Sequence, residues 1–109
     1  MRLLSFLKRG NYTSLPERLY GRWSLIKAEG AIETGHGVTM TFTDDGKLVY
    51  VIHQKDSNQI TNLVFRVEGP HLVTNQPSQP QEERTSFSFD AEGHLVLDYD
   101  GSKAWFARK

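Results

Sequence analysis

The chain has 109 residues, which is enough for one domain and too few for two. It has no cysteine, which excludes disulfides, thiolate metal sites and a cysteine nucleophile. Its 13 basic residues balance its 13 acidic residues without forming a basic run, so we expect no nucleic-acid partner. The apolar stretches are only a few residues long, so we also expect no membrane span.

Residues 1–10, MRLLSFLKRG, are partly apolar but do not have the pattern of a signal peptide. A signal peptide needs an apolar centre of roughly 7–15 residues and a small-residue cleavage site. We therefore expect a cytoplasmic protein. Leu3, Leu4 and Leu7 have helical spacing, which favours a short amphipathic helix that docks on the domain, frays in solution or touches a membrane surface.

Residues 13–23, TSLPERLYGRW, favour a second short helix. Ser14 and Glu17 have the spacing of a capping box, Pro16 suits a first helical turn, and Gly21 ends the helix. We therefore assign residues 1–19 to an N-terminal helical segment and residues 20–109 to a separate domain. The side chains of the second helix that we expect to face the core are Leu15, Leu19 and Tyr20.

After Gly21 the apolar residues recur at every second position, which indicates β-strands. Short polar or glycine-containing segments such as DDGK, GP, DAEG and DG separate the strands and favour tight turns. No helix of crossover length lies between them, which excludes a parallel sheet. The eight predicted strands span residues 22–28, 38–43, 47–53, 60–69, 71–74, 84–89, 94–99 and 102–108.

Eight consecutive antiparallel strands leave two unpaired edges if the sheet stays open, and closure removes both. We therefore predict an all-β fold, an eight-stranded antiparallel up-and-down barrel preceded by the short helical segment. The interior of an eight-stranded barrel is just wide enough for side chains or for one small ligand.

The stretches GRWSL, TFTDDGKLVY and FDAEGHLVLDYDGSKAWFARK resemble the small bacterial lipocalin-like domains of the calycin superfamily, and the resemblance covers residues 20–109. It rests on Gly21-x-Trp23, on the eight-strand order and on Arg108 near the end of the last strand. The resemblance implies that Gly21 lets the chain bend from the helix into the barrel. It also implies that Trp23 plugs the closed end and that Arg108 packs across the indole. These roles are structural, so the resemblance supplies no catalytic residue.

The inward faces of the predicted strands are rich in aromatic residues, which is compatible with a filled core and with a pocket that opens opposite Trp23. We expect Trp105 to face inward, and residues 47–53 could present either face to the interior because Val49 and Val51 are also apolar. An apolar outer face would suit a homodimer, and its members would be Val49, Val51, Val64, Val96 and Phe106. The candidate ligand-binding residues are Met40, Phe42, Tyr50, Phe65, Phe87 and Tyr99 inside the barrel and His36 in the loop before the second strand.

No pattern in the chain indicates a metal, a cofactor or a catalytic centre. The four histidines, His36, His53, His71 and His94, do not have metal-ligand spacing. Turn chemistry explains the acidic pair in TDD, residues 43–45. A calycin-type enzyme would bring Tyr50, Tyr99 and Arg66 together in a polar pocket, but core tyrosines with an exposed arginine are the favoured interpretation.

Non-catalytic binding of a small apolar molecule inside the barrel is therefore the leading hypothesis, and it rests partly on analogy of fold. The first alternative is an interaction module with a filled core that self-associates and takes no ligand. The second alternative is a small calycin-type isomerase or lyase.

Overall fold

The computed structural model describes residues 17–29 and 37–109. His36, Leu15 and the predicted amphipathic helix near the N-terminus lie outside the described residues. A single helical turn at residues 17–19 leads directly into the first strand, as the position of Gly21 predicts.

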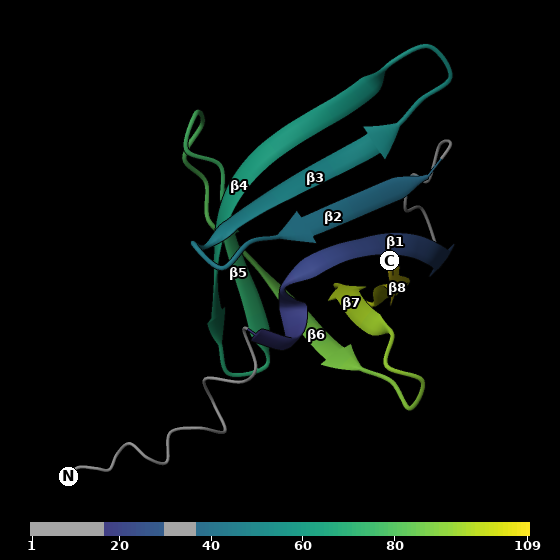
Figure 1. Ribbon diagram of the computed structural model, residues 1–109. Helices are drawn as coiled ribbons and strands as arrows, with labels where there is room; N and C mark the ends of the chain where they lie inside the picture. The colour runs from purple at the N-terminus through teal and green to yellow at the C-terminus, as the bar shows by residue number, and fades with distance from the viewer. Residues whose placement is uncertain (1–16, 30–36) are drawn as a thin grey trace, which may run out of the picture.

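Eight antiparallel strands form a closed barrel in the order in which they occur along the chain (Figure 1). The predicted all-β up-and-down barrel is therefore confirmed. Predicted and observed strand ends agree to within two residues, and the largest difference is at the start of the fourth strand, which begins at Asn58 where residue 60 was predicted. The strands are β1 Gly21–Ala28, β2 Val38–Phe42, β3 Lys47–His53, β4 Asn58–Glu68, β5 His71–Asn75, β6 Glu83–Phe89, β7 Leu95–Tyr99 and β8 Ser102–Arg108.

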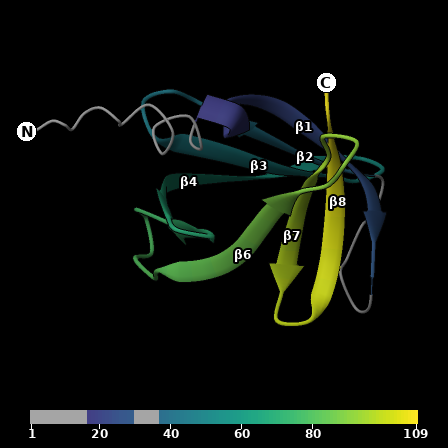
Figure 2. The same cartoon turned by 90° about the horizontal axis from the view of Figure 1, so that it is seen from below.

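Pairing of β1 with β8 closes the barrel, and Figure 2 shows β8 beside β7 and close to β1. Trp23 lies opposite Arg108, and Leu25 lies opposite Phe106. The register shifts between Leu25 and Lys27, so β1 carries a bulge there, and Ile26 is 52% exposed. Bulges bend a strand and increase its twist, which a small barrel needs in order to close.

The core is apolar and combines inward side chains from the strands with Leu19 from the helical turn. Leu48, Tyr50 and Ile52 of β3 belong to this core or pack against it, so these side chains face inward. The reversed assignment of residues 47–53, with Val49 and Val51 inside, is wrong. The fully or nearly fully buried members of the core cluster are Leu19, Trp23, Val38, Met40, Phe42, Leu48, Leu72, Phe87, Leu95, Leu97, Ala104 and Phe106.

The sequence-based faces of β8 were wrong, since Phe106 lies inside the barrel and Trp105 lies outside it. Phe106 is 1% exposed, whereas Trp105 is only half-buried and has the Lys27 ammonium 4.6 Å from its ring centroid. The reason is the two-residue period of a strand. If Arg108 reaches Trp23, then Phe106 must share its face, and Trp105 must point the other way.

The predicted apolar outer face is smaller than the sequence indicates. Phe106 is inside, and Val96 is buried with 9% exposure. Val64 is 41% exposed, and Val49 and Val51 are half-buried. What remains of the predicted face lies on β3 and β4, where Ile60 lies opposite Val51 and is 59% exposed.

Candidate functional site: a cavity above an aromatic base

Trp23 fills one end of the barrel. Its side chain is 1% exposed, and its indole Nε1 donates a hydrogen bond of 2.8 Å to the carbonyl oxygen of Leu19. A buried indole N–H needs an acceptor, and the helical turn supplies one from its last residues. The helical turn is therefore bound directly to the base of the barrel.

Arg108 covers the outer side of the indole. Its guanidinium carbon lies 4.2 Å from the centroid of the Trp23 ring, which is the stacking that the resemblance implies. The same guanidinium donates from Nη1 to the carbonyl of Tyr20 at 2.6 Å and from Nη2 to the carbonyl of Arg18. Arg108 thus joins the last strand to the turn that precedes the first strand.

Gly21 is required by both its conformation and its surroundings. Its φ is +110°, a conformation that residues with a Cβ rarely adopt. A Cβ at this position would lie 3.1 Å from Nη1 of Arg108. The glycine therefore permits the bend and also leaves room for the guanidinium over Trp23.

Phenylalanines complete this end of the barrel. Phe89 lies 6.1 Å from Trp23 between ring centroids, and Phe87 meets Phe89 edge-on at 6.0 Å. Phe42 and Phe65 form another edge-on pair at 5.0 Å. We call this group, with Trp23, the aromatic base. The rings pack against each other and fill this end of the barrel. The open space of the barrel therefore lies toward the opposite end.

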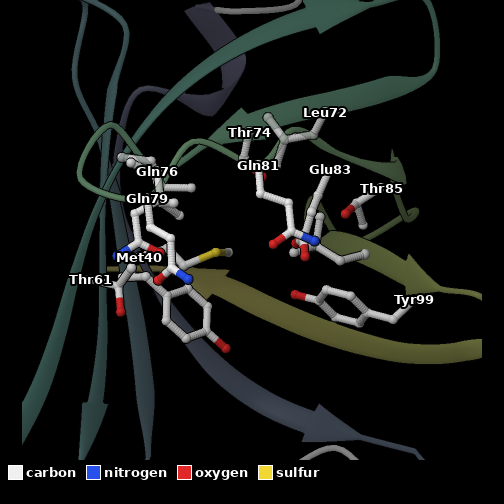
Figure 3. Close-up of a pocket in the computed structure, with 14 residues that line it drawn as sticks. Met40, Thr61, Leu72, Thr74, Gln76, Gln79, Gln81, Glu83, Thr85 and Tyr99 are labelled. Atoms are coloured by element: carbon white, nitrogen blue, oxygen red, sulfur yellow. The ribbon is translucent and has the colours of Figure 1, made fainter.

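A cavity of about 390 Å³ lies on the other side of the core. This volume has room for about a dozen water molecules at ~30 Å³ each. Its apolar wall consists of Met40, Leu48, Leu63, Leu72 and Leu97, with the rings of Tyr50 and Tyr99. Its polar lining consists of Thr61, Thr74, Gln76, Gln79, Gln81, Glu83 and Thr85 (Figure 3).

The strand register explains how these residues meet. Met40 lies opposite Tyr50, and Tyr50 lies opposite Thr61, so one row of inward positions crosses β2, β3 and β4. Thr74 lies opposite Glu83 on the neighbouring strands β5 and β6. The cavity is therefore built mainly on paired strands, which hold their side chains more rigidly than loops do.

The structure separates the predicted ligand-binding residues into two groups. Met40, Tyr50 and Tyr99 line the cavity, whereas Phe42, Phe65 and Phe87 belong to the aromatic base. Sequence reasoning missed the polar lining. Thr61 and Thr85 could have been found, because each lies two residues from an inward apolar residue, Leu63 and Phe87. The glutamines belong to the polar connection between β5 and β6, where no two-residue period assigns side chains to one face.

The electrostatics of the cavity are set by one carboxylate and two phenols. Among its described lining residues, Glu83 is the sole acid, and none is Lys, Arg or His. Burial raises the pKa of Tyr50 above its ordinary value of 10.0. Burial, followed by the nearby charges of Tyr50 and Glu83, raises the pKa of Tyr99. Both phenols are therefore neutral hydrogen-bonding groups at pH 7.

Arg66 does not join the two tyrosines. It lies on the outer face of β4, where its Nε donates to Glu68 and its Nη1 lies 3.0 Å from Glu82. The arrangement that a calycin-type enzyme would need from Tyr50, Tyr99 and Arg66 is thus absent from the described residues.

Asp90, Glu92 and His94 place one potential metal-ligand atom each within 4.8 Å of one another. They lie in the connection between β6 and β7. Asp90 Oδ1 already accepts the backbone N–H groups of Glu92 at 3.0 Å and His94 at 2.8 Å. Hydrogen bonds from backbone N–H groups to an aspartate side chain stabilise a turn. They account for Asp90 at this position without a metal ion.

No protein-family model and no curated protein matches the sequence. The structure, however, is similar to the crystal structure of a lipocalin-like protein from Bacteroides uniformis ATCC 8492, with a TM-score of 0.66. The similarity covers 84% of this chain and 99% of that chain, at 15% sequence identity. The fold is lipocalin-like. Within residues 17–29 and 37–109, no helix has the length and apolarity that crossing a membrane requires.

Proposed function

We propose that this lipocalin-like barrel binds one small molecule with an apolar body, and that it does so without catalysis. The observation that supports this most directly is the cavity of about 390 Å³, with aliphatic side chains and two tyrosine rings on its wall. Ligand sites of proteins range over about 300–1,000 Å³ and combine mostly apolar walls with a few polar groups. The polar lining would orient one end of the ligand.

The absence of catalysis is inferred from the chemistry of the lining. General acid–base catalysis favours a group whose pKa lies near the working pH. The pKa values of Tyr50 and Tyr99 are raised above 10.0, which moves both phenols away from neutral pH. Glu83 has no acid or histidine beside it among the described lining residues.

Blocking the cavity with a bulky side chain tests this proposal. The fluorescent probe is N-phenyl-1-naphthylamine, a neutral apolar compound whose emission rises in apolar surroundings. Thr61→Trp puts an indole into the cavity, and Asn62→Trp puts the same indole on the exposed outer face one residue away. We expect saturable binding to the unaltered protein and to N62W, and at least tenfold weaker binding to T61W. No saturable binding to the unaltered protein, or equal binding to both variants, would refute the proposal.

Self-association is a second candidate, supported by the exposed apolar surface on β3 and β4. Ile60 is 59% exposed, Val64 is 41% exposed, and Val51 lies opposite Ile60. A sheet face of this kind suits an isologous dimer. Sedimentation velocity over a hundredfold range of concentration tests it. We expect a dimer that Ile60→Lys dissociates, and a monomer at every concentration would rule the candidate out.

A further inference from the structure

Glu83 differs from the other acids around β4 to β6 in having no basic partner among the residues that the structure describes. Glu68 binds Arg66 and Arg84, and Glu82 lies 3.0 Å from Arg66. No salt bridge of the described residues includes Glu83, although the whole chain has equal numbers of basic and acidic residues. The unpaired carboxylate is therefore the one that lines the cavity.

The surroundings of Glu83 suit a cation. Figure 3 shows Glu83, Gln81 and Tyr99 together on one side of the cavity, and Tyr50 also lines it. Carboxylates accept charge-assisted hydrogen bonds from ammonium groups, and the faces of tyrosine rings attract cations. An anionic end group would instead meet a negative charge with no described basic residue in the lining to offset it.

We propose that the ligand is an organic amine, with an ammonium group held by Glu83 and an apolar body lying against Tyr50, Tyr99 and the aliphatic wall. This inference rests on the proposed function and specifies its ligand class. Glu83 sits at an exposed position of β6, so water screens the pair, and the preference for an amine should be moderate.

The experiment keeps the apolar body constant and changes the end group. 4-Phenylbutylamine, 4-phenylbutanol and 4-phenylbutanoate would compete with N-phenyl-1-naphthylamine at pH 7 and low salt. We expect the amine to bind about threefold more tightly than the alcohol, and the carboxylate to bind most weakly. Raising the salt concentration should reduce the difference between amine and alcohol.

Two variants connect the preference to Glu83. Glu83→Gln removes the charge and keeps the shape, so the amine should lose about threefold in affinity while the alcohol keeps its affinity. Glu82→Gln is the control, since it makes the same change of charge one residue away, where the side chain faces Arg66. It should leave all three affinities unchanged. Circular dichroism checks that both variants fold. The order of the three affinities is measured on the unaltered protein and does not depend on either variant.

The outcomes separate the two proposals. Alcohol binding that equals amine binding, with no effect of E83Q, would overturn the amine inference and leave the proposed function intact. Tightest binding of the carboxylate would overturn it as well. If neither the fluorophore nor any of the three compounds binds, the proposed function fails too. An amine preference that E83Q abolishes and E82Q preserves would support the inference.

Discussion

The two ends of this barrel are built from the same eight strands and have opposite properties. At the aromatic base, Trp23 and the phenylalanines pack against each other, and Arg108 and Gly21 fix the bend of the chain around them. At the cavity, the inward positions hold threonines, a glutamate and two tyrosines, and space remains between them. One end contributes to stability, and the other end has the composition of a binding site.

In a small barrel, a residue that faces inward therefore need not form part of the packed core. A threonine or glutamate at an inward position costs stability when it is buried dry, because its polar group loses water. At an open cavity that cost is small, since water or a ligand remains available. Substitutions at the base should therefore act on folding, and substitutions at the cavity should act on binding.

The largest expected effect is that of Trp23→Ala at the aromatic base. Truncation of a buried tryptophan costs about 3–5 kcal/mol of unfolding free energy, and a domain of this size has only about 5–15 kcal/mol in total. Urea denaturation measures the loss. Trp105→Ala is the matched control, because Trp105 is half-buried on the outer face, and it should cost less than half as much. Equal losses would show that Trp23 has no special place in the fold.

Gly21→Ala comes next and separates backbone strain from steric contact. A residue forced to positive φ costs about 1–3 kcal/mol, and here the added Cβ also meets Arg108 Nη1 at 3.1 Å. Gly101 has a similar φ of +103° with no atom within 4 Å of the added Cβ. G21A should therefore lower the unfolding free energy more than G101A does. Equal losses would mean that Arg108 moves aside without cost, and a smaller loss for G21A would contradict the prediction.

Arg108→Lys should have a smaller effect at the same end. Lysine keeps the charge but loses the planar stacking on Trp23 and one of the two carbonyl contacts, to Tyr20 or to Arg18. We expect a loss of about 1 kcal/mol by thermal or chemical unfolding. Arg22→Lys, on an exposed position of β1, should cost almost nothing. The comparison fails if both replacements are equally neutral.

The smallest effect concerns the cavity and depends on pH. The pKa of Tyr99 is higher in the folded protein than its ordinary value of 10.0, chiefly because of desolvation, although the residue as a whole is 37% exposed. Its contribution to stability is therefore complete below pH 10 and is lost as the pH rises above it, because the unfolded chain releases the phenol proton first. Tyr99→Phe should flatten the fall in melting temperature between pH 9 and pH 11. Parallel curves for the two proteins would contradict this assignment.

Much of the fold could be predicted from local patterns. The alternation in VTMTF and the turn residues in DDGK fix β2, β3 and the hairpin between them without reference to the rest of the chain. Gly21 and Trp23 could be placed because the resemblance to small lipocalin-like domains implies their roles at the entry bend and at the closed end. The faces of β8 were wrong because Trp105 and Phe106 are adjacent and both aromatic, so hydrophobicity alone cannot decide which one points inward.

The cavity could be predicted only in part, and Met40 and Phe42 show why. They lie two residues apart on the inward face of one strand, and only Met40 reaches the cavity. The two-residue period assigns a side chain to the inside of the barrel, but depth along the barrel axis depends on the tilt and stagger of all eight strands.

The sequence by itself therefore determined the number of strands, their order and most of their inward positions, because alternation and turn chemistry act over a few residues. Which inward residues fill the aromatic base and which line the cavity depends on the tertiary structure. Within the described part of the chain it also left Glu83 without a basic partner, since it directed Arg66 and Arg84 to the acids on the outer face. Such choices depend on the closure of β1 on β8, a contact between opposite ends of the chain that no local pattern encodes.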